Sequence, residues 1–140
     1  MAYKILLADD HEVVRRGVRT LLHGPSDWDV CGEAENGQQA VEKVLELKPD
    51  LVILDVSMPV MNGIEAARRI HQSAPAVKIV IFSMHDSPQI AQQAAEAGAS
   101  ACLLKSNAAS DLQRVVAGLL KSDGAPRGDG KVANRPAASL

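Results

Sequence analysis

Charged and polar side chains stand at the ends of several apolar runs in this 140-residue sequence. Two carboxylates, Asp9 and Asp10, follow the first run, and Asp55 ends a central one. Ser83 and Lys105 end two later runs. If these runs are parallel strands, their carboxyl ends share one edge of a sheet, where ligands bind in open α/β folds. We therefore expect the five side chains to converge at that edge.

These residue types favour one kind of chemistry. Three carboxylates held close together repel, and without a cation at least one should stay protonated. A divalent ion that prefers oxygen resolves this conflict, and Mg2+ commonly takes one or two carboxylates together with waters and phosphate oxygens. An aspartate can also attack phosphorus and carry a covalent acyl phosphate. The Lys105 ammonium and the Ser83 hydroxyl would then neutralise or hydrogen-bond the transferring phosphoryl oxygens.

Asp55 is the residue around which the chain is organised. Residues 51–54 are four consecutive apolar residues, a pattern typical of a short strand buried on both faces. Pro59 follows four residues after Asp55 and cannot continue a central strand. Asp55 is therefore predicted at the carboxyl end of a central strand, at the mouth of a loop. His11 directly follows Asp10, and His85 lies two residues after Ser83. We expect both histidines to face solvent.

The remaining elements alternate between strand and helix patterns. Apolar runs predict further strands at residues 3–8, 28–34, 77–82 and 101–104. The segments between these strands and after the last one carry apolar residues at helical spacing, which predicts helices there. These residues include Val13, Val18, Leu45, Ile64, Ile70, Ala94, Leu112 and Val116. Five strand–helix units predict an α/β fold with a parallel sheet and helices on both faces. The doubly wound, flavodoxin-like strand order 2-1-3-4-5 is the natural closure.

Composition excludes several classes of protein. The formal net charge of −2 gives no electrostatic case for direct nucleic-acid binding by this chain. No apolar run reaches membrane-spanning length, and the N-terminus lacks a signal-peptide pattern. Two cysteines form neither a disulfide framework nor a metal spacing, so we expect a cytoplasmic protein with reduced thiols.

Residues 122–140 lose all periodicity and are predicted to be a flexible linker or tail after a domain at 1–121.

Taken together, the motifs resemble the response-regulator receiver domain of two-component signalling, from about Tyr3 to Lys121. The resemblance is carried by Asp9-Asp10, Asp55 with Met58-Pro59, Asn62-Gly63, Ser83 and Lys105. Further stretches resemble the NarL/LuxR-type subgroup: Asp9-Asp10-His11, Gly32-Glu33-Ala34, Met84-His85-Asp86 and Leu103-Leu104-Lys105.

The resemblance implies a role for each site residue. Asp55 would accept a phosphoryl group from a histidine kinase, while Ser83 and Lys105 contact the phosphoryl oxygens. Four groups would hold Mg2+: Asp9, Asp10, Asp55 and the backbone carbonyl of Ser57. Phosphorylation would switch the face formed by the fourth strand and fourth helix. It would control a partner or an output domain outside this chain, for which DNA-binding transcription regulation is expected.

The sequence departs from the usual receiver pattern at three points, and several alternative functions stay open. Cys102 stands where the family usually has an aromatic residue, Ser106 replaces the proline that many receivers have after the lysine, and the sequence ends without the subgroup's DNA-binding domain. A stand-alone receiver, a phosphate relay and a phosphorylation-independent interaction module are alternative functions. A flavodoxin-like electron carrier is disfavoured by the scarcity of aromatics, and a haloacid-dehalogenase-type hydrolase by Ser57 in place of a second aspartate. We expect a signalling receiver rather than an enzyme, as a monomer or a weak phosphorylation-dependent homodimer.

Overall fold

The computed structural model describes residues 3–23 and 27–121. Within these ranges the strands are β1 (Tyr3–Ala8), β2 (Trp28–Ala34), β3 (Leu51–Asp55), β4 (Lys78–Ser83) and β5 (Ala101–Leu104). They form one parallel sheet in the order β2-β1-β3-β4-β5, which confirms the predicted fold class. The predicted tail at 122–140 lies outside the described residues.

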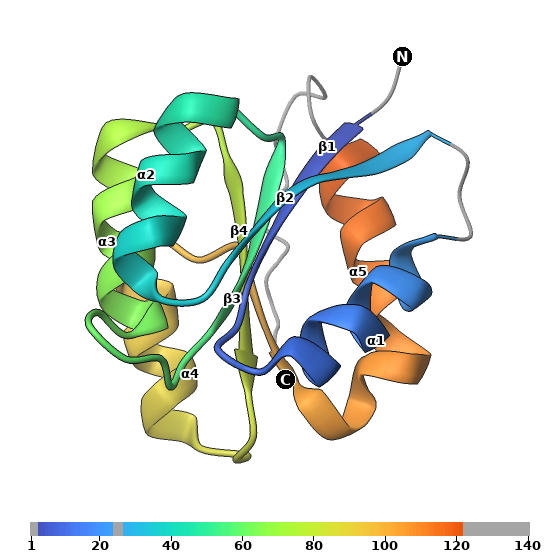
Figure 1. Ribbon diagram of the computed structural model, residues 1–140. Coiled ribbons are helices and arrows are strands. Elements are labelled where there is room, and N and C mark those ends of the chain that lie inside the picture. The colour runs from blue at the N-terminus through green and yellow to red at the C-terminus, as the bar shows by residue number, and fades with distance from the viewer. Residues whose placement is uncertain (1–2, 24–26, 122–140) are drawn as a thin grey trace.

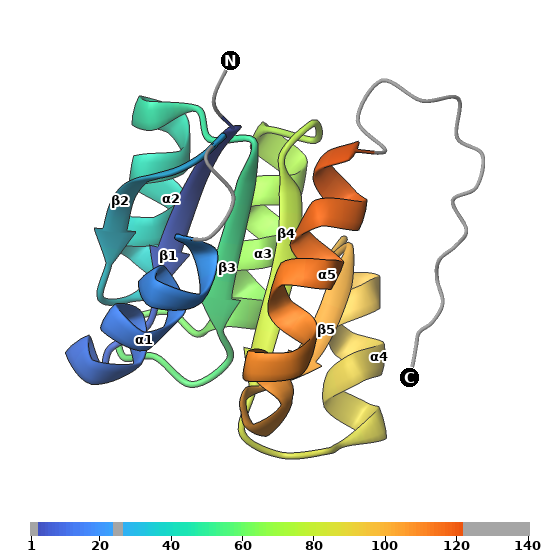
Figure 2. The same cartoon turned by 90° about the vertical axis from the view of Figure 1, so that its right-hand side faces the viewer.

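Helices cover both faces of this sheet. They are α1 (Glu12–Leu22), α2 (Gly37–Leu47), α3 (Gly63–Ser73), α4 (Pro88–Glu96) and α5 (Ala108–Lys121), and a 3-10 turn (Lys105–Asn107) precedes the last of them. α2, α3 and α4 lie on one face, and α1 and α5 lie on the other (Figure 1). Figure 2 looks onto the face covered by α1 and α5, and the carboxyl ends of all five strands point toward the same lower edge.

The sheet separates two aliphatic cores. The first lies under α2, α3 and α4 and includes Leu6, Val44, Val52, Leu54, Ile70, Ile79 and Ile81. The second lies under α1 and α5 and includes Ile5, Leu7, Leu22, Ile53, Val80, Leu112 and Leu120. Because the residues of β3 alternate between these cores, the whole strand is buried. This double burial explains its continuous apolar sequence.

Some details of the helix faces differ from the prediction. Val13 is 76% exposed and Leu45 is 52% exposed, so neither belongs to the buried stripe of its helix. The buried face of α1 instead carries Arg15 with Val18 and Leu22. The spacing of these three residues is helical, but a charged residue in the stripe hides it from an apolar pattern.

Candidate functional site

The carboxyl ends of β1, β3 and β5 bring four of the predicted site residues together. Asp9 and Asp55 are buried, at 4% and 3% exposure, whereas the neighbouring Asp10 is exposed. Lys105, the first residue after β5, places its Nζ 2.9 Å from Asp9 Oδ2 and 3.1 Å from Asp55 Oδ1. Its side chain is only 16% exposed. The predicted convergence of the three acids with Lys105 is therefore observed.

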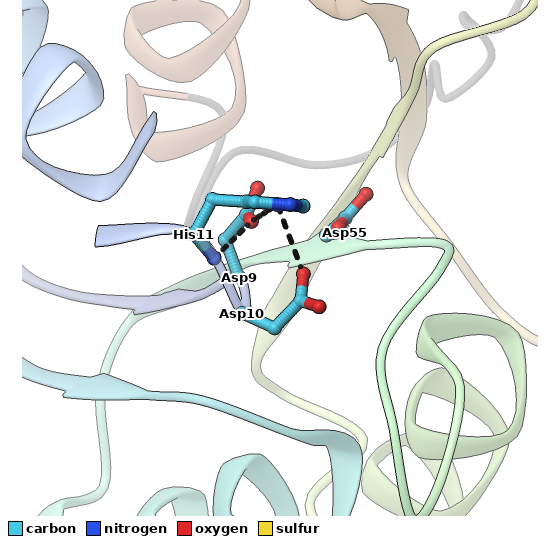
Figure 3. Close-up of side chains that lie close together, drawn as sticks. All are labelled: Asp9, Asp10, His11 and Asp55. Atoms are coloured by element: carbon cyan, nitrogen blue, oxygen red, sulfur yellow. Dashed lines mark hydrogen bonds and ion pairs between the residues drawn. The ribbon is translucent and has the colours of Figure 1, made fainter. Parts of the chain in front are cut away.

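The acidic residues form a cluster that also contains a histidine. One ligand atom from each of Asp9, Asp10, His11 and Asp55 lies within 4.8 Å of the others (Figure 3). The His11 Nδ1 atom is 3.2 Å from Asp9 Oδ1 and 3.1 Å from Asp10 Oδ1. The side chain of His11 is 63% exposed, as expected for a solvent-facing residue, but its ring nitrogen faces the carboxylates. Sequence reasoning missed this contact.

The charges of the cluster suit a divalent cation. Of the three carboxylates in the cluster, those of Asp9 and Asp55 contact the Lys105 ammonium, and three negative charges against one positive charge leave two negative charges when the acids are ionised. Burial raises the pKa of Asp55, and the charge of Asp9 raises it further, against the opposing effect of Lys105. Burial alone would lower the pKa of Lys105, but its hydrogen bond to Asp9 and the charge of Asp55 outweigh that effect and raise it. An oxygen-seeking cation would relieve the remaining repulsion.

The two predicted serines occupy different surroundings. Ser83 is buried at the end of β4, and its hydroxyl donates to the carbonyl oxygen of His85 at 2.8 Å and accepts from the His85 amide at 3.1 Å. These bonds hold the hydroxyl against the loop that follows β4. Ser57 is exposed and lines an open groove of about 950 Å³ together with Asp10 and Asn62.

An asparagine–glycine pair fixes the backbone around Asp55. Gly63, the first residue of α3, donates its amide to the Val56 carbonyl oxygen at 2.9 Å. A Cβ atom at this position would lie 2.1 Å from the carbonyl oxygen of Asp55. Asn62 caps the same helix by accepting from the amide of Glu65. The Asn-Gly pair therefore starts α3 and also allows its first turn to pack directly against the backbone of Asp55.

Comparison with known proteins identifies the family of this site. The family model for the response regulator receiver domain matches residues 5–117. The chain belongs to the response regulator receiver domain family. It is the receiver domain of a two-component response regulator, as the resemblance predicted.

Relatives of this receiver domain include known regulators. It is 37% identical over 116 residues to the response regulator protein VraR of Staphylococcus saprophyticus, which covers 83% of this chain and 56% of the relative. It is 40% identical over 113 residues to the transcriptional regulatory protein LnrK of Bacillus subtilis, covering 81% of this chain and 51% of the relative. The chain thus spans about half the length of these curated relatives.

Solved structures support the same assignment. A LuxR-family two-component response regulator from Aurantimonas superposes with a TM-score of 0.82 at 36% identity, covering 87% of both chains. The receiver domain of the putative regulator NarL from Mycobacterium tuberculosis gives 0.81 at 31% identity, covering 86% of this chain and 97% of the other. The predicted NarL/LuxR-type subgroup is confirmed. Among the described helices, none is long and apolar enough to cross a bilayer.

A buried arginine of the receiver domain holds the backbone of the acidic site at Asp9. Arg15 donates from Nη1 to the backbone carbonyl oxygen of Asp9 at 2.6 Å and from Nε to Glu33 Oε1 at 2.7 Å. Arg19 also pairs with Glu33. Arg15 therefore ties α1 and the end of β2 to the residue where β1 leaves the sheet. The helical spacing of Arg15 from Val18 and Leu22 is the sequence signal that could have predicted its burial.

Replacing Arg15 by alanine should lower the free energy of unfolding by about 2 kcal/mol, because a largely buried ion pair loses one partner. The expected cost is below that of a fully buried pair, since Glu33 keeps Arg19 and is 25% exposed. Urea unfolding measures the change. Arg16→Ala is the matched control, because its pair with Glu12 is exposed and should be worth less than about 0.5 kcal/mol. Equal effects of the two substitutions would contradict this role of Arg15.

The raised pKa of Asp55 predicts a pH dependence of stability in metal-free solution. The unfolded chain releases this proton near the ordinary value of 3.8, below the pKa of the folded protein. The free energy of unfolding therefore falls as pH rises through this window. Asp55→Asn should be more stable than the unsubstituted protein at pH 7, by about 1–2 kcal/mol.

Urea unfolding in EDTA between pH 7 and pH 4 tests this expectation. The advantage of Asp55→Asn should shrink as pH falls toward 3.8, where the carboxylate of the unfolded chain becomes protonated. An advantage that stays constant with pH, or a loss of stability, would contradict it.

Proposed function

We propose that Asp55 accepts a phosphoryl group from a histidine kinase in a Mg2+-dependent reaction. The observation that carries this proposal is the position of the Asp55 carboxylate, buried at the sheet edge, 3.1 Å from Lys105 and within a cluster of metal-ligand atoms. Receiver domains as a family act with histidine kinases, which supports the choice of donor.

In the proposed reaction, a carboxylate oxygen of Asp55 attacks the phosphorus atom of a phosphorylated histidine. The phosphorus–nitrogen bond breaks, the imidazole leaves with the electron pair, and an acyl phosphate remains on Asp55. Water later hydrolyses this acyl phosphate, restoring the carboxylate and releasing inorganic phosphate. We propose that the domain assists only its own phosphorylation and dephosphorylation and has no other enzymatic activity.

The proposed ligands of Mg2+ are Asp9, Asp10, Asp55 and the backbone carbonyl of Ser57. Bound there, Mg2+ would neutralise charge on the phosphoryl oxygens and on the carboxylates. Lys105 already bridges Asp9 and Asp55, and we propose that it turns one of these contacts toward a phosphoryl oxygen. Arg15 keeps the backbone of Asp9 in place during this exchange.

Ser83 is proposed to carry the signal away from the site. Its hydroxyl would exchange its bonds with His85 for a phosphoryl oxygen, which would shift the loop leading to α4. Within α4 only Ala94 is buried, so moving this helix disturbs little apolar contact. The switched face would comprise β4 and α4.

The output of the switch is proposed to be transcription regulation through an output domain outside this chain. The name of the relative LnrK, a transcriptional regulatory protein, supports this choice. A stand-alone receiver, a phosphate relay and an interaction module that works without phosphorylation are the alternatives. The free thiols of Cys31 and Cys102 agree with the proposed cytoplasmic location. The proposed state is a monomer or a weak phosphorylation-dependent homodimer.

Intact-mass spectrometry after incubation with acetyl phosphate and Mg2+ tests the proposal. The protein should gain the mass of one phosphoryl group, and excess EDTA should prevent the gain because the carboxylates then lack their counter-ion. Equal phosphorylation in EDTA would overturn the requirement for Mg2+. The absence of any added mass with Mg2+ present would overturn the phosphoacceptor assignment.

A further inference from the structure

Val60 has a backbone conformation that residues of its type avoid. Its φ angle is +69°, and because its side chain is 82% exposed, side-chain packing does not impose this angle. Among the described residues other than glycine, only Lys48 also has a positive φ, and Lys48 is the C-cap of α2, where left-handed residues are common. A β-branched residue with a positive φ is strained, and such strain is concentrated at functional sites.

Hydrogen bonds hold this strained turn in place. The Met61 amide donates to the Pro59 carbonyl oxygen at 2.7 Å, which closes a three-residue turn around Val60. The Met61 carbonyl oxygen in turn accepts from the Gly37 amide at 2.9 Å. Gly37 is the first residue of α2, so the start of this helix lies against the loop between β3 and α3 (Figure 1). The turn is therefore bonded to an element that lies outside the acidic cluster.

The contact with α2 requires glycine at position 37. A Cβ atom there would lie 2.3 Å from the Met61 carbonyl oxygen and 2.8 Å from its carbonyl carbon. Both atoms belong to the backbone, so a larger residue would push the loop and the helix apart. Asn36 fixes the start of the helix by accepting from the Gln39 amide. We therefore expect the loop to be the part that moves.

The same loop carries backbone groups that face Asp55. The Ser57 amide hydrogen-bonds the Asp55 carboxylate. Ser57, Met58 and Pro59 line the same open groove as Asp10. Because the Pro59 carbonyl oxygen closes the turn, a different conformation at the next residue would move this stretch and change the distance between Ser57 and Asp55.

We propose that Val60 and Gly37 are positioning residues for the Asp55 site: the left-handed turn at Val60, held against α2 by Gly37, fixes the backbone of Ser57 beside Asp55. This inference rests on the proposed function for the reaction that the site performs. Neither residue belongs to the acidic cluster, so both act through the loop. The strain at Val60 persists because the bonds of Met61 to Pro59 and Gly37 hold the turn.

Two substitutions at position 60 separate the backbone conformation from the side chain. Val60→Gly removes the side chain and keeps a positive φ without strain, so its Mg2+ affinity should stay within about twofold of the unsubstituted protein. Val60→Pro fixes φ near about −65° and is incompatible with the turn. It should weaken Mg2+ binding about tenfold, the lower end of the usual effect of residues that orient metal ligands. Isothermal titration with Mg2+ measures both affinities.

Amide NMR of the metal-free protein gives a readout that does not depend on the ion. The Ser57 amide resonance should shift more in Val60→Pro than in Val60→Gly, because only the proline displaces the amide from the Asp55 carboxylate. A Ser57 amide that shifts equally in the two variants would overturn the proposal. Equal losses of Mg2+ affinity in the two variants would also overturn it, since they would assign the effect to the side chain of Val60.

Gly37→Ala tests the contact with α2 and replaces Val60→Pro if that variant does not fold. Because the new methyl group displaces Met61, Mg2+ binding should weaken about tenfold and the Ser57 amide should shift. Gly98→Ala is the control for lost stability. Its Cβ would lie 2.4 Å from the His71 ring, and its φ is +99°, but Gly98 precedes β5 and so lies at the opposite edge of the sheet.

Gly98→Ala should therefore unfold at a lower temperature than the unsubstituted protein and still bind Mg2+ with unchanged affinity. Equal losses of Mg2+ affinity in Gly37→Ala and Gly98→Ala would show that Gly37 contributes only stability, and would overturn its positioning role.

These readouts also separate the positioning role from the phosphorylation chemistry. If Val60→Pro shifts the Ser57 amide and weakens Mg2+ binding, but the unsubstituted protein never gains a phosphoryl group, the positioning role stands and the proposed function is wrong. If acetyl phosphate modifies Asp55 at the same rate in the unsubstituted protein, Val60→Pro and Gly37→Ala, the positioning role is wrong and the proposed function stands.

Discussion

The Asp55→Asn variant should gain no phosphoryl mass when incubated with acetyl phosphate and Mg2+. An amide is a poor nucleophile, and the neighbouring Asp9 carboxylate is engaged by Lys105 on one oxygen and by the His11 amide on the other. Loss of a nucleophile costs several orders of magnitude, so we expect at least about a 1000-fold slower reaction. Intact-mass spectrometry over time measures it.

Asp86→Asn is the control for this experiment. Asp86 is exposed in the loop after β4, at the same edge of the sheet, and does not belong to the metal-ligand cluster. Its substitution should leave the added mass unchanged. Added mass in Asp55→Asn at the level of the unsubstituted protein would move the phosphoacceptor to another residue.

The Gly63→Ala substitution should destabilise the domain by about 3 kcal/mol, at the upper end of the usual cost of overpacking. The new methyl group would lie 2.1 Å from the Asp55 carbonyl oxygen and 2.8 Å from its carbonyl carbon. Both atoms belong to the backbone, so relief requires α3 or the end of β3 to move. Phosphorylation of Asp55 should slow as well, because its backbone is displaced.

Gly17→Ala is the matched control for Gly63→Ala. Gly17 lies in α1, where an added Cβ would meet nothing within 4 Å. This substitution should stabilise the protein by about 0.5–1 kcal/mol through helix propensity alone. Thermal and urea unfolding of the two variants measure both changes. Equal stability of Gly63→Ala and the unsubstituted protein would show that α3 does not need this close approach.

Local sequence patterns predicted most of the fold. β1, β2 and β5 have the predicted bounds, while β4 is shifted by one residue, from 77–82 to Lys78–Ser83. Strands buried on both faces or paired at an edge have distinct periodicities. The order 2-1-3-4-5 is the common doubly wound closure for five strand–helix units. The convergence of Asp9, Asp55 and Lys105 was predictable for the same reason, since parallel strands end at one edge.

The sequence could not determine which side chains on a predicted helix are buried. The helical spacing predicts Val13 on an apolar face, but Val13 is exposed, whereas the charged Arg15 two residues later is buried. Burial of an arginine depends on acceptors from other elements, here the Asp9 carbonyl oxygen and Glu33. The first acceptor lies directly after β1 and the second lies in β2, so only the tertiary structure brings them together.

The sequence by itself determined the elements and the composition of the acidic site, because strand ends and residue types are local properties. Only the tertiary structure decided the direction of individual polar atoms. The Ser83 hydroxyl faces its own loop, and the His11 ring nitrogen faces two carboxylates. Such orientations depend on rotamers and on partners supplied by the packed fold, and no local pattern of residues specifies them.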